Sequence, residues 1–253
     1  MISIGYLSWK RHDIFKQTLT SHKNNNLYDI IQPQNRLIFF QEISKIDIEI
    51  AEKFNCKYMG NKDNIGILNA FIELVEACTT EYFIFCENDW YLVENKNITS
   101  KILEDAIKML DNNIANIVKL RHRKLYGEPL YSKPSNIDEW MKGNYNNCPY
   151  KLESLSWLEN PNIVYNNIMT EFTNNYKWYI TTLEHQKWSN NVFIGKTDYI
   201  KDVILPLLKN NINSNKYNGL EDILINYIGN SEEKYSKLKL AGGEGLFMHK
   251  DKI

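Results

Sequence analysis

The chain has 253 residues, of which 43% are hydrophobic and 24% are charged, and its formal net charge is −1. This size and balance are typical of one globular domain with a sizeable apolar core. The small net charge argues against a general electrostatic nucleic-acid binder, and no apolar run reaches the roughly 18 residues that a membrane span needs. The four cysteines show neither a C-x-x-C pair nor a histidine at zinc-finger spacing. We therefore expect a protein of a reducing, cytoplasmic compartment without a zinc finger.

Strand-like and helix-like segments alternate over the first 120 residues, judged by the spacing of their apolar residues. The expected strands lie at 2–7, 36–41, 81–86 and 114–120, and the expected helices near 14–19, 67–78 and 102–110. Asp13 is placed to cap the first of these helices. Such alternation is typical of parallel βαβ units and predicts an α/β fold with a layered sheet.

The pattern changes after residue 120. Residues 121–190 are rich in Trp, Tyr, Asn and Pro and show little periodicity, which predicts an aromatic-rich insertion with short elements of its own. Regularity returns with a strand at 192–195 and two helices, one capped by Asp198 and one over 220–228; Pro206 should kink or shorten the former. No repeat or linker marks a boundary, so we predict a single domain over 1–253.

Glu87, Asn88 and Asp89 follow the clearest predicted strand. In open α/β sheets, ligands bind outside the carboxyl ends of the strands, which is where this acidic motif belongs. If the chain stays extended, Glu87 and Asp89 point the same way, and both carboxylates can converge on one hard cation that would neutralise a diphosphate. An acidic turn solvated at a strand end is the competing interpretation.

Asn64 and Gly66 precede the helix that leads into this strand. Gly66 permits a positive φ or a close backbone approach, and the free amides of a helix N-terminus suit an anion. An isolated N-x-G sequence is also a common turn.

The order of these motifs resembles the GT-A glycosyltransferases of the family-2 type over about residues 1–120. The shared features are a first strand that ends in Ser8, Lys10 and Arg11, the N-x-G turn, and a buried strand that runs into an acidic x-D motif. The resemblance implies a GT-A, Rossmann-like fold with a mixed, mostly parallel sheet flanked by helices. It also implies that residues 1–120 bind a nucleotide sugar and that residues 121–253 bind the acceptor.

Roles for the first-half residues follow from the same resemblance. Glu87 and Asp89 would hold Mn²⁺ or Mg²⁺ against the diphosphate of a UDP-sugar, with Asn88 between them. The residues expected to contact the donor are Ser8, Lys10, Arg11, Glu42, Asn64, Gly66 and Asn88, with Glu42 directed to the uracil.

Two C-terminal motifs extend the resemblance. Glu221 and Asp222 precede a helix, as does the motif from which inverting GT-A enzymes take their general base, and a carboxylate at a helix N-terminus is readily kept ionised. Simple helix capping is the alternative. His249 follows a glycine-rich strand similar to the one in which several GT-A groups carry a metal-binding histidine; a solvated bystander is the alternative.

Trp188, Asn190 and Asn191 precede the 192–195 strand, where related enzymes line the acceptor pocket. The asparagines would bind sugar hydroxyls and Trp188 would stack on a sugar ring. A capped turn with a core tryptophan is equally consistent with these residues. The basic cluster 121–124 would grip an anionic group or be solvated.

Together these features predict a metal-dependent, inverting glycosyltransferase that moves a hexose from a UDP-sugar to a hydroxyl of a carbohydrate or glycosylated acceptor. A retaining mechanism, which needs no such base, stays open. One alternative is a sugar nucleotidyltransferase, although residues 7–11 lack the glycines of its phosphate loop. The other is a non-catalytic GT-A-like module that binds carbohydrate or assists assembly.

Overall fold

The computed structural model describes residues 1–123, 159–210, 219–221, 223–224 and 237–250. The strands are β1 (Ile2–Trp9), β2 (Arg36–Gln41), β3 (Lys57–Gly60), β4 (Tyr82–Glu87), β5 (Trp90–Leu92), β6 (Ile117–Arg121), β7 (Thr170–Thr173), β8 (Lys177–Thr182), β9 (Phe193–Lys196) and β10 (Lys239–His249). The helices are α1 (His12–Asn24), α2 (Leu27–Ile30), α3 (Lys45–Lys53), α4 (Gly66–Ala77), α5 (Lys96–Asp111), α7 (Pro161–Val164), α8 (Thr197–Tyr199) and α9 (Leu205–Asn210), with the short helical segments η1 (Pro33–Asn35) and η4 (Ile200–Ile204).

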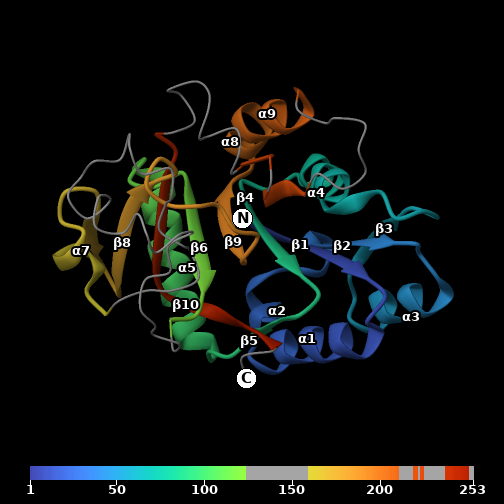
Figure 1. Ribbon diagram of the computed structural model, residues 1–253. Helices are drawn as coiled ribbons and strands as arrows, with labels where there is room; N and C mark the ends of the chain where they lie inside the picture. Colours follow the sequence, from blue (N-terminus) through green and yellow to red (C-terminus); the bar gives the residue numbers. More distant parts are fainter. Residues whose placement is uncertain (124–158, 211–218, 222, 225–236, 251–253) are drawn as a thin grey trace.

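All the described strands join one sheet in the order β3-β2-β1-β4-β9-β6-β10-β8-β7, and β5 pairs with β10 (Figure 1). β1 lies between β2 and β4 and is parallel to both, so that Leu7 stands opposite Phe39 and Glu87. Among the described strands, β5, β8 and β9 run opposite to the rest. The sheet is therefore mixed and mostly parallel, as predicted.

Alternation along the strands separates two apolar cores, one on each face of the sheet. Ile4 and Tyr6 of β1 face the core covered by α1, α2, α3 and α5, whereas Leu7 faces the core covered by α4, η4 and α9. Figure 1 shows α1, α2 and α3 on one side of the sheet and α4, α8 and α9 on the other. The result is a helix–sheet–helix arrangement, which leaves the carboxyl ends of β1, β2 and β4 at one shared edge.

Two expected caps are wrong, because each helix begins two residues earlier than predicted. α1 starts at His12 after Arg11, which has a left-handed φ of 52°, and Asp13 lies in the first turn, where its charge favours the helix dipole. α8 likewise starts at Thr197, ahead of Asp198. The helix is then π-helical over η4, which ends two residues before Pro206, in keeping with the disruption expected there.

The aromatic-rich region contributes directly to the sheet. Its described part, 159–190, forms α7 and a β7–β8 hairpin, and β8 is antiparallel to β10. None of the helices in the described part of the chain is long and apolar enough to cross a membrane. Cys56, Cys78 and Cys86 are buried free thiols, and Cys148 lies outside the described residues.

Candidate active site

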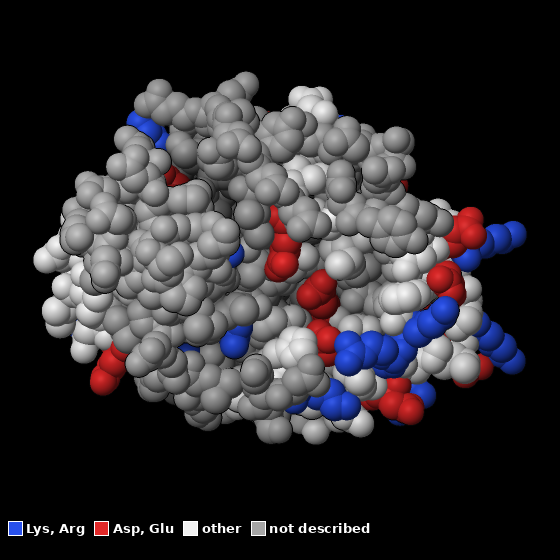
Figure 2. All heavy atoms as spheres, in the orientation of Figure 1, with Lys and Arg blue, Asp and Glu red and all other residues white. Residues whose placement is uncertain are grey.

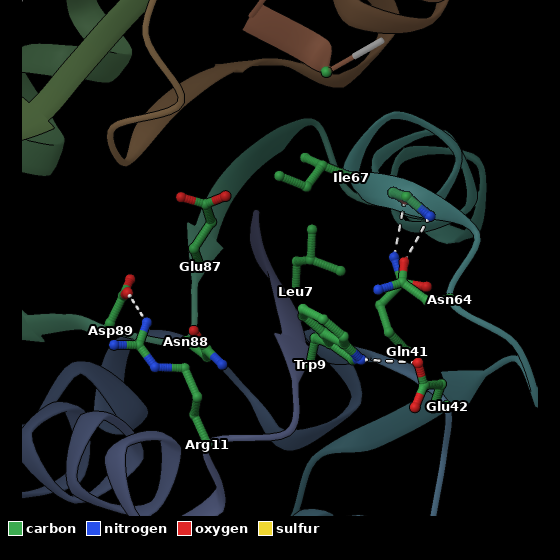
Figure 3. A pocket seen from close by; sticks show the side chains of 12 residues that line it. Leu7, Trp9, Arg11, Gln41, Glu42, Asn64, Ile67, Glu87, Asn88 and Asp89 are labelled. Atoms are coloured by element: carbon green, nitrogen blue, oxygen red, sulfur yellow. Dashed lines mark hydrogen bonds and ion pairs between the residues drawn. The ribbon is translucent and has the colours of Figure 1, made fainter. Parts of the chain in front are cut away.

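A cavity of about 630 Å³ opens at the carboxyl ends of β1, β2 and β4 (Figure 3). Its lining residues are Leu7, Trp9, Arg11, Gln41, Glu42, Asn64, Gly66, Ile67, Glu87, Asn88, Asp89 and Gly219. The volume is within the roughly 300–1,000 Å³ that is usual for small-molecule sites. Acidic side chains gather near the middle of this face, with basic side chains beside them (Figure 2). The structure thus brings together seven predicted site residues, from Arg11 to Asp89, that are far apart in sequence.

Gln41 organises the Asn64–Gly66 turn, and sequence reasoning missed it. Its side-chain oxygen accepts from the amide of Ile65 at 2.8 Å, and its amide nitrogen donates to the carbonyl of Gly66 at 2.9 Å. The Gly66 amide donates to Asn64 Oδ1 at 2.9 Å, and Gly66 has a φ of 81°, which favours glycine. The amides of Ile65 and Gly66 are therefore already satisfied, so the prediction that the turn offers free amides to an anion is wrong for these two.

Trp9 and Glu42 lie near Gln41, on the other side of the cavity from Glu87 and Asp89 (Figure 3). The indole N–H of Trp9 donates to Glu42 Oε1 at 3.2 Å, and Lys10 Nζ lies 2.8 Å from Glu42 Oε2. Lys10 also sits over the Trp9 ring, 5.1 Å from its centroid. Lys10, a predicted donor contact, does not line the cavity and instead contacts two residues that do. Trp9 is 47% exposed, and the sequence analysis overlooked its ring.

Ser8 does not line the cavity, although it stands between two residues that do. Successive side chains of a strand point to opposite faces, so Leu7 and Trp9 turn toward the cavity and Ser8 turns away. Ser8 is buried, and within the described residues its hydroxyl has no hydrogen-bond partner. The structure does not support the predicted side-chain contact of Ser8 with a nucleotide.

Glu87 is the last residue of β4, and the chain turns at Asn88 and Asp89 before β5 begins at Trp90. The condition that the E-x-D segment stays extended, under which Glu87 and Asp89 would point the same way, is therefore not met. Burial, followed by the negative charges of Asp89 and Glu221, raises the pKa of Glu87 to about 8. The Glu87 carboxyl consequently keeps its proton at neutral pH when no positive charge lies beside it.

Asp89 is bound from two sides. Arg11 Nη1 donates to Asp89 Oδ2 at 2.8 Å, and His249 Nε2 lies 3.4 Å from the same oxygen. Pairing of β10 with β5 sets His249 opposite Trp90, and the two rings pack edge to face at 5.3 Å. The C-terminal strand therefore reaches the acidic motif, as predicted from the sequence.

The predicted metal ligands have suitable donor chemistry, since carboxylate oxygens and an imidazole nitrogen suit Mn²⁺. A cation would also relieve the repulsion between Glu87 and its two carboxylate neighbours. Across the described residues, however, no three His, Cys, Asp or Glu side chains are gathered into a ligand set, and Arg11 neutralises Asp89. The residue types fit a divalent cation, but the structure does not assemble them around one.

Glu221 lies two residues after Gly219, which lines the cavity. The backbone amide of Asn190 donates to Glu221 Oε1 at 2.5 Å. Asp222, the other predicted base, lies outside the described residues.

Trp188 is buried, packs edge to face on Phe193 at 5.2 Å, and donates its indole N–H to Asn190 Oδ1 at 3.2 Å. Trp188 is therefore a core tryptophan, and the prediction that it stacks on a sugar is not supported.

Asn190 and Asn191 are also buried and do not line the cavity, so the structure does not bring their side chains to the predicted sugar site. The sequence analysis also missed Lys119, the buried lysine of β6 beside this segment. Its signal was a lone lysine within the otherwise apolar run 117–120.

No protein-family model matches this sequence, and no curated protein matches it either. Solved structures do match. Staphylococcus aureus TarS 1–349 has a TM-score of 0.50 at 15% identity, over 97% of this chain and 59% of that chain, and its complex with UDP has a TM-score of 0.50 at 14% identity over the same shares. Glucosyl-3-phosphoglycerate synthase from Mycobacterium tuberculosis, in complex with Mn²⁺, UDP and glucosyl-3-phosphoglycerate, has a TM-score of 0.50 at 10% identity, over 98% of this chain and 71% of that chain.

This chain thus spans about three fifths of the TarS structure it matches. At such low identities the similarity shows only that the strands and helices are arranged alike. The fold predicted from the motif order is confirmed: the protein has a GT-A fold.

Proposed function

We propose that this chain is a glycosyltransferase that moves a hexose from a UDP-sugar to a hydroxyl of a carbohydrate or glycosylated acceptor. The observation that carries the proposal is the cavity at the carboxyl ends of β1, β2 and β4, where the acidic motif and the Asn64–Gly66 turn meet within a GT-A fold. The TarS and glucosyl-3-phosphoglycerate synthase structures with UDP support a uridine donor. Residues 1–120 then form the donor half and 121–253 the acceptor half.

The donor would lie across the cavity from Trp9 to Asp89. The exposed face of Trp9 suits stacking on a nucleobase, and Glu42, fixed by Trp9 and Lys10, can accept from a base N–H. Arg11 reaches the same space from the end of β1, and its guanidinium suits a phosphate. Donor binding would therefore draw Arg11 from Asp89 toward the diphosphate.

Glu87, Asp89 and His249 would hold a divalent cation, Mn²⁺ or Mg²⁺, which when bound supplies positive charge to the leaving diphosphate. For this role the Glu87 carboxyl must lose its proton, and Asp89 must exchange its contact with Arg11. Both changes follow if donor and cation bind together. The Mn²⁺ in the glucosyl-3-phosphoglycerate synthase complex supports this part of the proposal.

Glu221 or Asp222 would take the proton of the acceptor hydroxyl as its oxygen bonds to the anomeric carbon, while the bond from that carbon to the diphosphate oxygen breaks and UDP leaves, with inversion. Glu221 stands two residues after Gly219 of the cavity wall, and one of its oxygens is fixed by the Asn190 amide. The other carboxylate oxygen of Glu221 would serve as the proton acceptor.

Calorimetry and thermal shift with UDP-, GDP- and CMP-sugars, each with and without Mn²⁺, test the proposal first. We expect a UDP-sugar to bind and to raise the melting temperature, and Mn²⁺ to strengthen both effects. Release of UDP in the presence of Mn²⁺ would then demonstrate turnover. Formation of a UDP-sugar and pyrophosphate from UTP and a sugar phosphate would instead identify a nucleotidyltransferase, and carbohydrate binding without donor turnover would identify a non-catalytic module.

A further inference from the structure

Lys119 is a charged residue in the middle of the apolar strand β6. Its side chain is only 4% exposed. Its Nζ donates to the carbonyl of Ser189 at 2.6 Å, lies 3.8 Å from the centroid of the Trp188 ring, and is 5.0 Å from that of Phe193. The ammonium is thus enclosed by one hydrogen-bond acceptor and two aromatic rings.

Burying an ammonium group costs desolvation free energy, which a purely structural position does not require. Burial lowers the pKa of Lys119 to about 7, while the nearby charge of Glu221 acts in the opposite direction. An apolar side chain of similar size would avoid the cost of desolvation, and such replacements of buried charges are often neutral or stabilising. The charge therefore calls for a role that a methionine at this position would not perform.

The contacts of Lys119 lead in three steps to the candidate base. Lys119 holds the Ser189 carbonyl and the Trp188 ring, and Trp188 donates to the Asn190 side chain at 3.2 Å. The Asn190 amide then donates to Glu221 Oε1 at 2.5 Å. Segment 188–191 is further tied to β6 by the adjacent bond from the Leu120 amide to the Val192 carbonyl. This links Glu221 to the central sheet.

We propose that Lys119 is a positioning residue for the transfer reaction, which clamps segment 188–191 to β6 so that the Asn190 amide fixes the Glu221 carboxylate. The proposal rests on the proposed function, because it takes Glu221 as the base. Lys119 itself touches neither donor nor acceptor in this scheme. Its ammonium acts through the segment and through its charge beside Glu221.

The experiment compares Lys119→Met with a matched control, Lys201→Met. Lys201 also donates to a backbone carbonyl, that of Cys78 at 2.8 Å, but it lies in η4, away from the cavity. We expect Lys119→Met to lower kcat about 10- to 100-fold, as a small misplacement of a reacting group does, with UDP affinity and melting temperature near those of the wild type. Lys201→Met should leave kcat unchanged, and Lys119→Arg should restore part of the lost kcat.

Hydrogen exchange at the Asn190 amide, measured by NMR, tests the hydrogen bond from Asn190 to Glu221 without requiring turnover. We expect faster exchange at Asn190 in Lys119→Met and unchanged exchange in β1 and β4. Lys119→Gln, which keeps a donor for Ser189 but loses the charge, replaces the methionine variant if that one does not fold.

Wild-type kcat with unchanged Asn190 exchange in the variant would overturn the proposal. An equal loss of kcat in Lys201→Met would do the same, since the effect would then be general. A wild type that binds no nucleotide sugar would instead remove the proposed function, and Asn190 exchange would still decide whether Lys119 positions Glu221.

Discussion

The proposed donor side of the site, at the cavity, and the proposed acceptor side, around Glu221, are built in different ways. On the donor side, the lining residues stand at the ends of regular strands, and Gln41 and Glu87 each close the strand that positions them. On the acceptor side, Glu221 is held by the amide of a segment outside any helix or strand, and that segment is held in turn by a buried lysine. Strand ends place the donor-side residues, and polar contacts such as that between Arg11 and Asp89 then hold them. The segment that holds Glu221 has no strand end to place it and depends on polar contacts alone. Changes on the two sides should therefore separate binding from turnover.

The largest expected effect lies on the acceptor side. Glu221→Gln should lower kcat about 100- to 10,000-fold, the range for loss of a general base, and should leave UDP affinity nearly unchanged. Steady-state kinetics and calorimetry with UDP check the two parts. The paired variant Asp222→Asn identifies the base, because only one of the two substitutions should show the full loss. Near-normal turnover in both would mean that the enzyme retains configuration or takes its base from elsewhere.

Asp89→Ala should produce the complementary result on the donor side. It removes the carboxylate that Arg11 and His249 share, so UDP binding in Mn²⁺ should weaken on the order of 100-fold, while the fold persists. Calorimetry with UDP in saturating Mn²⁺ measures the effect. Asp13→Ala is the control, since Asp13 is exposed in the first turn of α1. Unchanged UDP affinity in Asp89→Ala would remove Asp89 from the donor site.

The donor side was also the more predictable side. Strands at 36–41 and 81–86 were found from apolar runs, and their ends locate Glu42 and Glu87 at the sheet edge because parallel strands share that edge. Ser8 shows the limit of that reasoning, since locating a strand end does not say which side chains turn toward the cavity. Because side chains alternate along a strand, Ser8 points away from the cavity that its neighbour Leu7 faces.

The acceptor side depends on contacts that no local pattern encodes. Lys119 and Ser189 are 70 positions apart, and Asn190 and Glu221 are 31 apart. Trp188 fitted either a sugar platform or the core, and its burial against Phe193 decides for the core. Composition and spacing place such residues near a strand, but the residues that they contact in the folded chain determine their role.

His249 joins the two halves of the chain and should show a smaller effect. Its imidazole lies 3.4 Å from Asp89 Oδ2, and nitrogen ligands suit Mn²⁺ better than Mg²⁺. His249→Ala should therefore weaken Mn²⁺ binding about 10-fold, as loss of a metal-site residue commonly does, with less effect on Mg²⁺. Titrations of both ions in the presence of UDP measure this. The control is His185→Ala, because the His185 ring contacts Glu184 and not Asp89. If His249→Ala changes the affinity for both ions equally, His249 is not a ligand.

Glu87 should give the smallest effect, seen as pH-dependent stability. Its pKa in the folded protein is about 8, against an ordinary value of 4.5, so between these values the folded chain holds a proton that the unfolded chain has lost. The free energy of unfolding should therefore fall as the pH rises from about 4.5 to 8, and level off above that. Glu87→Gln is neutral throughout, so its melting temperature should lie close to that of the wild type at pH 5 and above it at pH 8.5. Differential scanning calorimetry without divalent ions measures the difference.

Saturating Mn²⁺ with UDP should reverse the sign of this difference in melting temperature, because a cation favours the Glu87 carboxylate and gains nothing comparable from glutamine. A melting temperature that changes equally with pH in both proteins would show that Glu87 is not the group responsible.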